Sequence, residues 1–230
     1  MGAIYLIRHG QASFAAADYD DLSPLGREQG RVLGAALAAR HVSADLVICG
    51  GMRRHQQTAT ECLSAQSLPL AWEVDSGWDE YDHNEVLGGL DARYREQTAI
   101  AADMLGSTDP RRAFQQIFER AMARWVDGAY HADYRESWPV FCARVEGALD
   151  RLKTRLGKSQ TAVVFTSGGA ISVVCRKLLG LGDQRTLVLS ASLANASVTK
   201  LIVGGRGLSL STLNEHAHFE LADKRLITYR

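Results

Sequence analysis

A few polar residues in this sequence have the chemistry needed to hold a small anion. Arg8 and His9 directly follow one apolar run, and Ser167 and Gly168 directly follow another. A guanidinium group forms paired hydrogen bonds with an oxyanion, a histidine can act as nucleophile or proton carrier, and a glycine lets the backbone approach a ligand closely. Together these residue types predict a site for an anion such as a phosphoryl group.

Arg53 and Arg54 are further candidates for the same site. They follow Gly50 and Gly51 and lie near the beginning of a predicted helix. The positive end of the helix dipole makes a cation there mildly unfavourable, whereas it favours a bound anion. This position indicates that one or both of these arginines bind an anion together with the helix terminus. The alternative, a solvated surface residue, stays open for each of them because the chain is rich in arginine.

Three apolar runs of strand length must position these residues. Residues 3–7, 45–49 and 162–166 are each followed by a turn that contains glycine, which is typical of buried strands. In open α/β sheets, ligands bind beyond the carboxyl ends of the strands. We therefore expect Arg8, His9, Ser167 and one or both of Arg53 and Arg54 to meet at one edge of a sheet.

Helices are predicted between these strands, and a hairpin is predicted after them. A proline at position 24 suits the first turn of a helix, and the apolar residues that follow have helical spacing. Helices are expected from residues 23–24 onward, at 53–65 and at 169–179. Strands are expected near 72–74 and at 197–203 and 208–213, and a turn at 204–207 joins the last two.

A helical insertion is predicted at about residues 90–157. Two amphipathic helices begin there, one at Asp109 and Pro110 and the other at Ser137, with no strand between them. Their aromatic stripes are typical of a buried core. Because the sequence has no repeat or low-complexity linker, we expect a single domain over residues 1–230 that carries this insertion.

Composition excludes several classes of protein. The 230 residues carry 26 Lys and Arg against 26 Asp and Glu, so the chain lacks the basic excess of a nucleic-acid-binding protein. The amino-terminal segment does not resemble a signal peptide, and no apolar stretch approaches the roughly 20 residues that span a bilayer. The 4 cysteines are scattered and form no C-x-x-C pair, which indicates reduced core residues. We expect a cytoplasmic protein that binds neither nucleic acid nor membrane.

Six motifs in order along the chain resemble those of the histidine phosphatase superfamily, in its phosphoglycerate mutase-like group. They are LIRHGQ at 6–11, LSPLGREQ at 22–29, RxxQTA at 54–59, WDEY at 78–81, ESWxxFxxRV at 136–145 and TSGG at 166–169. The resemblance covers nearly the whole chain. It implies an α/β fold, a three-layer α/β/α sandwich with a mostly parallel central sheet and an inserted helical subdomain.

The resemblance also implies a mechanism. His9 would attack phosphorus and form a phosphohistidine, while Arg8 and Arg54 hold the phosphoryl oxygens. Glu80 matches the family's proton donor to the leaving alcohol, and Ser167 and Gly168 match its later phosphate-binding motif. The implied activity is that of a metal-independent phosphatase without a cofactor. Its partner would be a small phosphorylated substrate or a phosphoprotein.

Ser167 departs from the family pattern, which usually has a second histidine there. A hydroxyl is a shorter, uncharged donor, and loss of one preorganised donor costs about 10²- to 10³-fold in rate. The enzyme is then slowed, or the protein is a catalytically silent binder, or another residue supplies the donor. His83, three residues after Glu80, is the best substitute, and Asn84 stands where many relatives have glycine.

Two other functions compete with hydrolysis. A mutase would return the phosphoryl group to a bound intermediate, but residues 11–15 lack the Glu-x-x-x-Trp-Asn pattern of the family's mutases. A non-catalytic phosphoryl-binding module is the other possibility, and Ser167 is the reason to consider it. Selectivity would depend on the loops at residues 82–95 and 128–136.

Overall fold

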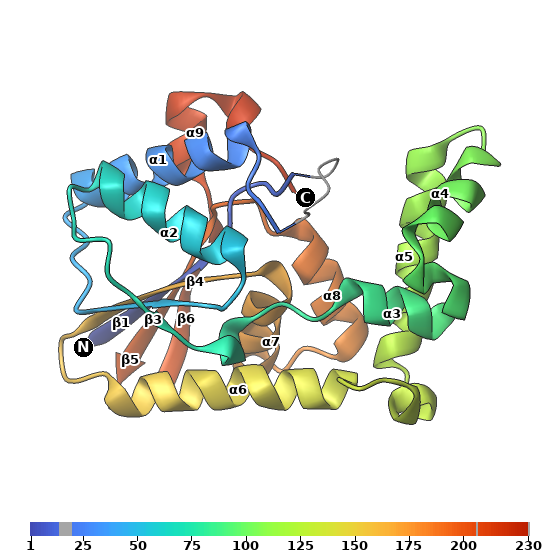
Figure 1. Cartoon of the computed structure of the whole chain (residues 1–230). Coiled ribbons are helices and arrows are strands. Elements are labelled where there is room, and N and C mark those ends of the chain that lie inside the picture. The colour runs from blue at the N-terminus through green and yellow to red at the C-terminus, as the bar shows by residue number, and fades with distance from the viewer. Residues whose placement is uncertain (14–19, 206, 230) are drawn as a thin grey trace. The chain divides into compact units, whose positions relative to one another are not determined.

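The computed structural model describes residues 1–13, 20–205 and 207–229 (Figure 1). Phe14 and Ala15, within the segment compared above with the mutases, and Arg206 of the predicted turn lie outside the described residues. The chain forms two compact units, one made of Met1–Glu80 with Arg144–Arg230 and the other of Tyr81–Ala143. The prediction of one domain with an insertion at about 90–157 stays a prediction.

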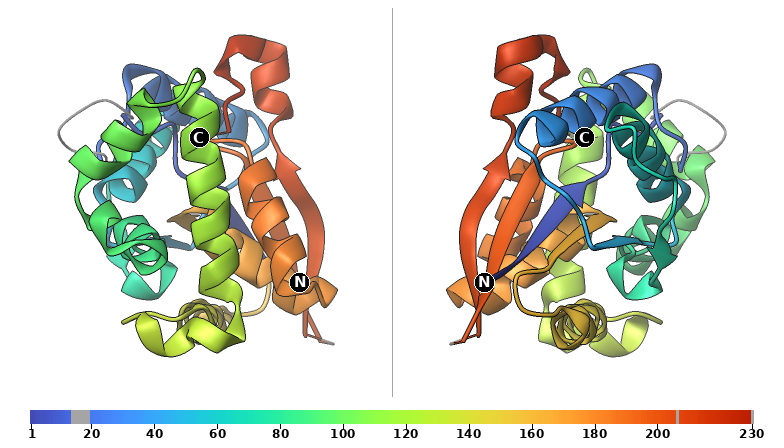
Figure 2. Two further views of the ribbon diagram at one scale, coloured as in Figure 1. Left: turned by 90° about the vertical axis from the view of Figure 1, so that its right-hand side faces the viewer. Right: turned by 90° about the vertical axis from the view of Figure 1, so that its left-hand side faces the viewer.

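A mixed sheet forms the centre of the first unit. Within the described residues it has 6 strands in the order β3-β2-β4-β1-β5-β6. These strands are β1 (Gly2–Arg8), β2 (Leu46–Cys49), β3 (Glu73–Val74), β4 (Thr161–Thr166), β5 (Val198–Gly204) and β6 (Gly207–Glu215). The first four run parallel to one another, and β5 and β6 form the predicted antiparallel hairpin beside β1. Figure 2 shows this hairpin in orange and red.

The register of the parallel strands brings their carboxyl ends together. Arg8 of β1 pairs with Thr166 of β4, and Cys49 of β2 pairs with Phe165 of β4. Because β4 lies between β1 and β2, the residues that follow these three strands share one edge of the sheet. This edge is the place predicted for the anion site.

Helices cover both faces of the sheet, so the predicted three-layer α/β/α architecture is confirmed (Figure 1). One face packs against α1 (Pro24–Ala39), α2 (Arg53–Ala65) and α9 (Ala217–Ala222), in a core that includes Ile7, Phe165, Leu33, Ala59 and Phe219. The other face is covered by α7 (Gly168–Leu179) and by the part of α6 (Trp138–Arg155) from Arg144 onward. Helix α8 (Asp183–Ser192) packs on α7.

Local sequence explains where several helices begin and end. The Ser23 hydroxyl accepts a hydrogen bond from the backbone N–H of Gly26, and Pro24 occupies the first turn of α1. Asp109 and Pro110 do the same for α5 (Pro110–Val126). Helix α7 ends at Gly180, whose φ of 65° lies in the left-handed region that glycine adopts without strain.

The second unit is helical. It contains α3 (His83–Leu90), α4 (Gln97–Leu105), α5 and the beginning of α6, with an aromatic core. The ring centroid of Trp125 lies 4.8 Å from that of Tyr81 and 5.2 Å from that of Trp138. The predicted aromatic stripes thus form the core of this unit. Short 3₁₀ segments in the two units are Ser76–Trp78, Ala92–Arg95, Gly128–Asp133 and Lys224–Leu226. No helix of the described segments is long and apolar enough to cross a bilayer.

Candidate active site

His9 lies directly after β1, with only 6% of its surface exposed. Its backbone N–H donates to the carbonyl of Thr166 (2.8 Å), which ties the residue to the end of β4. The ring Nδ1 lies 2.7 Å from the carbonyl oxygen of Gly10. Because a carbonyl can only accept, Nδ1 must carry the proton, and Nε2 is left with the lone pair that a nucleophile needs.

The surroundings of His9 keep its imidazole neutral. Burial lowers the pKa of His9 well below its usual range, and the charges of Arg54 and Arg8 lower it further. A neutral imidazole is the reactive form for attack on phosphorus. The two guanidinium groups therefore have two effects at this site: they keep the nucleophile unprotonated, and they attract an anion.

The two arginines come from different elements. Arg8 is the last residue of β1, and its Nη1 donates to the carbonyl of Leu193. Arg54 is the second residue of α2 and is 6% exposed. Its Nη1 lies 2.7 Å from Oδ1 of Asp20, whose other oxygen accepts the backbone N–H of Arg53 (2.7 Å). The Asp20 carboxylate thus contacts the Arg54 guanidinium group, which is expected to bind a phosphoryl oxygen.

Ser167 is fully buried at the amino-terminal end of α7, and its hydroxyl contacts a histidine that we had not predicted. The Ser167 Oγ lies 2.6 Å from Nε2 of His55, which is also fully buried. The ring centroids of His55 and His9 are 5.7 Å apart. A second imidazole is therefore present beside His9, but it comes from α2 and not from position 167.

Glu80 is held at the beginning of the same helix. Its Oε2 accepts the backbone N–H of Gly169 (3.0 Å). The loop before it is anchored by Arg144, whose Nη1 donates to the carbonyls of Ser76 (3.0 Å) and Asp79 (3.0 Å). Thr166, the last residue of β4, adds a hydrogen bond from its hydroxyl to the carbonyl of Trp78 (2.6 Å). Glu80 is thus placed at the carboxyl edge that also carries His9.

Glycines allow the close approaches around the site. A Cβ on Gly10 would lie 2.4 Å from the carbonyl oxygen of Gly26, so the backbones of these two residues can only pack as they do without side chains. A Cβ on Gly168 would lie 3.5 Å from Nε of Arg8. Gly168 thus lies beside Arg8, at an ordinary contact distance, and its role in phosphate binding stays a prediction.

His83, the predicted substitute donor, begins α3 and belongs to the second unit. Asn84 follows it, and the N–H of Asn84 donates to the side chain of Asp82 (2.9 Å) in a helix cap. The role of His83 stays a prediction.

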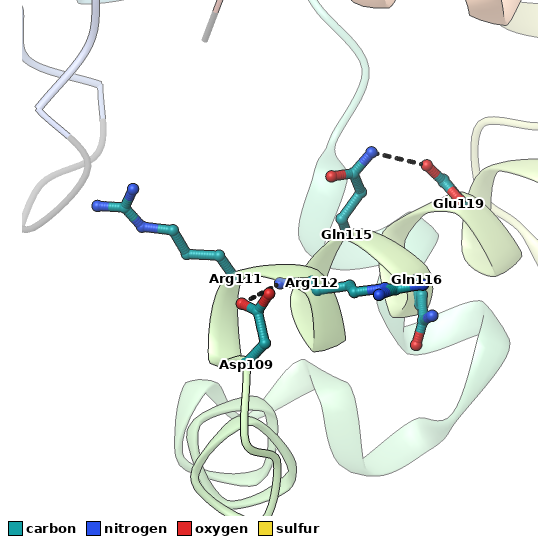
Figure 3. Close-up of a pocket in the computed structure, with 6 residues that line it drawn as sticks. All are labelled: Asp109, Arg111, Arg112, Gln115, Gln116 and Glu119. Atoms are coloured by element: carbon teal, nitrogen blue, oxygen red, sulfur yellow. Dashed lines mark hydrogen bonds between the residues drawn. The ribbon is translucent and has the colours of Figure 1, made fainter.

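A hollow on the surface of α5 has no such chemistry. Its lining residues are exposed side chains of one helix or its cap, shown in Figure 3: Asp109, Arg111, Arg112, Gln115, Gln116 and Glu119. Asp109 caps the helix through the N–H of Arg112 (3.1 Å), and Gln115 donates to Glu119 (2.9 Å). These contacts are those of a solvated helix surface. Among the residues that the structure describes, no group of three or more His, Cys, Asp or Glu could hold a metal ion.

A buried neutral imidazole with two guanidinium groups, at the carboxyl edge of a mostly parallel sheet, makes this an α/β protein with a candidate site for an anion such as a phosphoryl group. The family model of the histidine phosphatase superfamily (branch 1) matches residues 4–216, and the chain belongs to this superfamily. No protein with a curated function matches the chain significantly by sequence.

Solved structures share the fold over nearly the whole chain. A mycobacterial glucosyl-3-phosphoglycerate phosphatase is 21% identical, with a TM-score of 0.63 over 93% of this chain and 98% of that one. Phosphoglycerate mutase from Bacillus anthracis is 18% identical, with a TM-score of 0.64 over 95% of each chain. The alpha-ribazole phosphatase from Shigella flexneri is 21% identical, with a TM-score of 0.63 over 93% and 96%. At these identities the likeness shows the fold.

Proposed function

We propose that this protein is a phosphatase that hydrolyses phosphomonoesters through a phosphohistidine on His9. The observation that carries the proposal is the state of that imidazole. Its Nδ1 lies 2.7 Å from the carbonyl of Gly10, and its buried setting lowers the pKa of His9, so that Nε2 has a lone pair at neutral pH.

In the first half of the reaction, the Nε2 lone pair of His9 forms a bond to phosphorus while the bond from phosphorus to the ester oxygen breaks. Arg8 and Arg54 balance the charge on the phosphoryl oxygens as the transition state develops. Glu80 gives its proton to the leaving oxygen, which departs as an alcohol. Its bond to the N–H of Gly169 supports this role, since it fixes the carboxyl group at the sheet edge that carries His9.

In the second half, water replaces the alcohol. The Glu80 carboxylate takes a proton from the water, whose oxygen attacks phosphorus, and the bond from phosphorus to Nε2 of His9 breaks. Inorganic phosphate and a neutral imidazole result, and Glu80 is protonated again. Every step uses groups of this chain, so we propose that hydrolysis is independent of metal ions and of any cofactor.

The test is turnover of an aryl phosphate such as p-nitrophenyl phosphate by the full chain, at several pH values and with EDTA. His9→Ala, purified in the same way, is the control, and circular dichroism shows whether it is folded. Hydrolysis that depends on His9 and persists in EDTA is expected. Equal rates for the two proteins would refute the phosphatase, and loss of activity in EDTA would refute metal independence.

The two competing functions give other results in this assay. A mutase needs a bisphosphorylated primer and transfers phosphate between substrates faster than to water. A non-catalytic module binds inorganic phosphate without turnover. We rank both lower, because the arrangement of His9 and Glu80 provides a nucleophile and a proton carrier.

We further propose a small phosphorylated metabolite or a phosphoprotein as substrate, and the cytoplasm as the place of action. The names of the similar phosphatases, which act on glucosyl-3-phosphoglycerate and alpha-ribazole phosphate, support a small substrate. The cysteines support a reducing compartment, because Cys49, Cys62 and Cys175 are free thiols buried in the core. Burial raises the pKa of the Cys62 thiol to about 12 and that of Cys175 to about 11.

A further inference from the structure

His55 is a buried histidine that the mechanism above does not use. It follows Arg54 on α2, and its side chain is fully buried on the helix face that also carries Ala59 and Cys62. A buried imidazole normally has a partner for each polar atom. The partners of His55 therefore indicate what it does.

One ring nitrogen of His55 is bonded to Ser167. Nε2 lies 2.6 Å from Oγ, a short hydrogen bond between two fully buried side chains. Ser167 is the residue before α7, where a serine usually accepts a bond from the backbone of its own helix. Here the N–H of Gly169 donates to Glu80 instead, and the serine hydroxyl is turned to His55.

The other ring nitrogen points to Gly50. A Cβ on Gly50 would lie 2.3 Å from Nδ1 of His55, so the glycine makes room for the ring. Nδ1 has no hydrogen-bond partner within the part of the chain that the structure describes. A proton on Nε2 therefore leaves no unsatisfied N–H, and that N–H donates to the Ser167 oxygen. The serine proton is then available for another acceptor.

The sheet brings this pair to the nucleophile. Ser167 follows β4, which lies between β1, the strand before His9, and β2, the strand before the helix of His55. The ring centroids of His9 and His55 are 5.7 Å apart. Ser167 thus lies at the end of the middle strand, β4, with His9 after the neighbouring strand β1 and His55 on the helix that follows β2.

We propose that His55 is a positioning residue of the phosphoryl site: it holds Ser167 so that the serine hydroxyl donates to a phosphoryl oxygen at His9. The inference rests on the proposed function. The N–H of His55 polarises the hydroxyl, because linked hydrogen bonds in a buried setting strengthen one another. The pair takes the place of the histidine that the family usually has at position 167, with the imidazole supplied from α2.

The first test compares two substitutions of similar size. His55→Gln keeps an N–H within reach of the serine oxygen, whereas His55→Met does not. We expect His55→Met and Ser167→Ala each to lower kcat by about 10²- to 10³-fold, as for the loss of one preorganised donor. His55→Gln should retain most of the wild-type kcat. The double variant His55→Met with Ser167→Ala should be no slower than the slower single variant, because the two residues act as a unit.

The second test moves the imidazole. Ser167→His alone should lose activity, because the new ring would have to enter space that begins 2.6 Å from Nε2 of His55. His55→Ala empties that space. The double variant His55→Ala with Ser167→His should therefore have a kcat at least about tenfold higher than His55→Ala alone, again on the scale of one donor. A merely structural histidine would not give this rescue.

A binding measurement separates this inference from the proposed function. The affinity for inorganic phosphate is measured by titration calorimetry. The wild type should bind it at least about tenfold more tightly than His55→Met does, because one hydrogen bond to a charged group contributes about that much. His218→Ala is the matched control, since His218 is buried at 7% exposure and contacts Phe219 and Glu215 on and next to α9.

The outcomes are distinct. If the wild type shows no turnover that depends on His9, the proposed function is refuted. The phosphate-binding measurement then still decides the role of His55. Unchanged phosphate affinity in a folded His55→Met variant overturns the inference, and so does a kcat within about threefold of wild type, well below the effect of one donor. Equal losses in His55→Gln and His55→Met also overturn it, because the N–H would then be irrelevant.

Discussion

Nε2 of His55 and Oγ of Ser167 lie 2.6 Å apart in a fully buried hydrogen bond, and the His55 ring is the neighbour of the His9 ring. Two histidines are thus buried side by side, with arginines close to them. Burial lowers the pKa of both, and the charge of Arg54 lowers them further. This pair of neutral imidazoles has consequences for both stability and activity.

The first prediction concerns stability against pH. An unfolded chain binds protons at these histidines near pH 6.5, whereas the folded protein does not until a lower pH. Between these values the unfolded state holds more protons, so the free energy of unfolding falls as the pH falls, by up to about 1.4 kcal/mol per pH unit for each imidazole.

Urea unfolding between pH 7 and 5 measures this slope. His55→Gln removes one of the two titrating groups and should reduce the slope by up to about 1.4 kcal/mol per pH unit. His41→Gln is the control, because it removes an exposed histidine instead of a buried one. An unaltered slope in His55→Gln would show that folded His55 takes up its proton over the same pH range as the unfolded chain, so that burial does not lower its pKa.

The second prediction concerns Gly50. A Cβ there would lie 2.3 Å from Nδ1 of His55 and 2.8 Å from Oδ1 of Asp79, so Gly50→Ala should displace the imidazole. We expect a loss of about 1–3 kcal/mol in the free energy of unfolding, typical of overpacking, together with a lower kcat. Gly51→Ala is the matched control, since its Cβ would be no closer than 3.3 Å to Asp79. Equal effects of the two substitutions would contradict the steric argument.

The third prediction tests Glu80 as the proton donor. Glu80→Gln keeps an oxygen for the N–H of Gly169 but removes the acidic proton. The kcat for an alkyl phosphate, whose leaving oxygen must be protonated, should fall by about 10²- to 10⁴-fold. The kcat for p-nitrophenyl phosphate, with its good leaving group, should fall much less. Similar losses for the two substrates would assign Glu80 a different task, and exposed Glu73→Gln should change neither.

The fourth prediction concerns the carboxylate on Arg54. Asp20 Oδ1 lies 2.7 Å from Nη1 of Arg54 and competes with a phosphoryl oxygen for it. The Asp20 side chain is 34% exposed, so the pair is screened and worth about 1 kcal/mol or less. Asp20→Asn should therefore lower the inhibition constant of inorganic phosphate by up to about fivefold. An increase would show that Asp20 chiefly holds Arg54 in place, and Asp21→Asn is the control.

Most of the central sheet and its helices could be predicted from local sequence. The apolar runs at 3–7, 45–49 and 162–166 correspond to β1, β2 and β4, and α2 covers the predicted residues Arg53–Ala65. These elements are buried, so hydrophobic periodicity and capping residues specify them. Helices α3, α4, α8 and α9 were missed. Helix α8 buries only Thr186 within its described residues, so its sequence has little of the pattern on which such predictions rely.

The candidate site was predictable where residues directly follow strands. Arg8, His9 and Ser167 lie at the sheet edge because β1 and β4 end there in register. His55 was missed because its partner is 112 residues away in the chain, and no local pattern reports such a contact. Its spacing to the buried residues 59 and 62 of α2 was a usable signal for burial. Burial of a histidine beside Arg54 would have marked it as a candidate.

Formation of a phosphohistidine on His9 tests the central claim most directly. The wild type and His9→Ala are mixed with p-nitrophenyl phosphate, stopped in alkali within the first turnovers, digested and analysed by mass spectrometry, because a phosphohistidine survives alkali and is lost in acid. The proposed function predicts an acid-labile phosphate on the peptide that contains His9, in the wild type alone. Turnover with phosphate on another residue, or with none on His9 under these conditions, would contradict it.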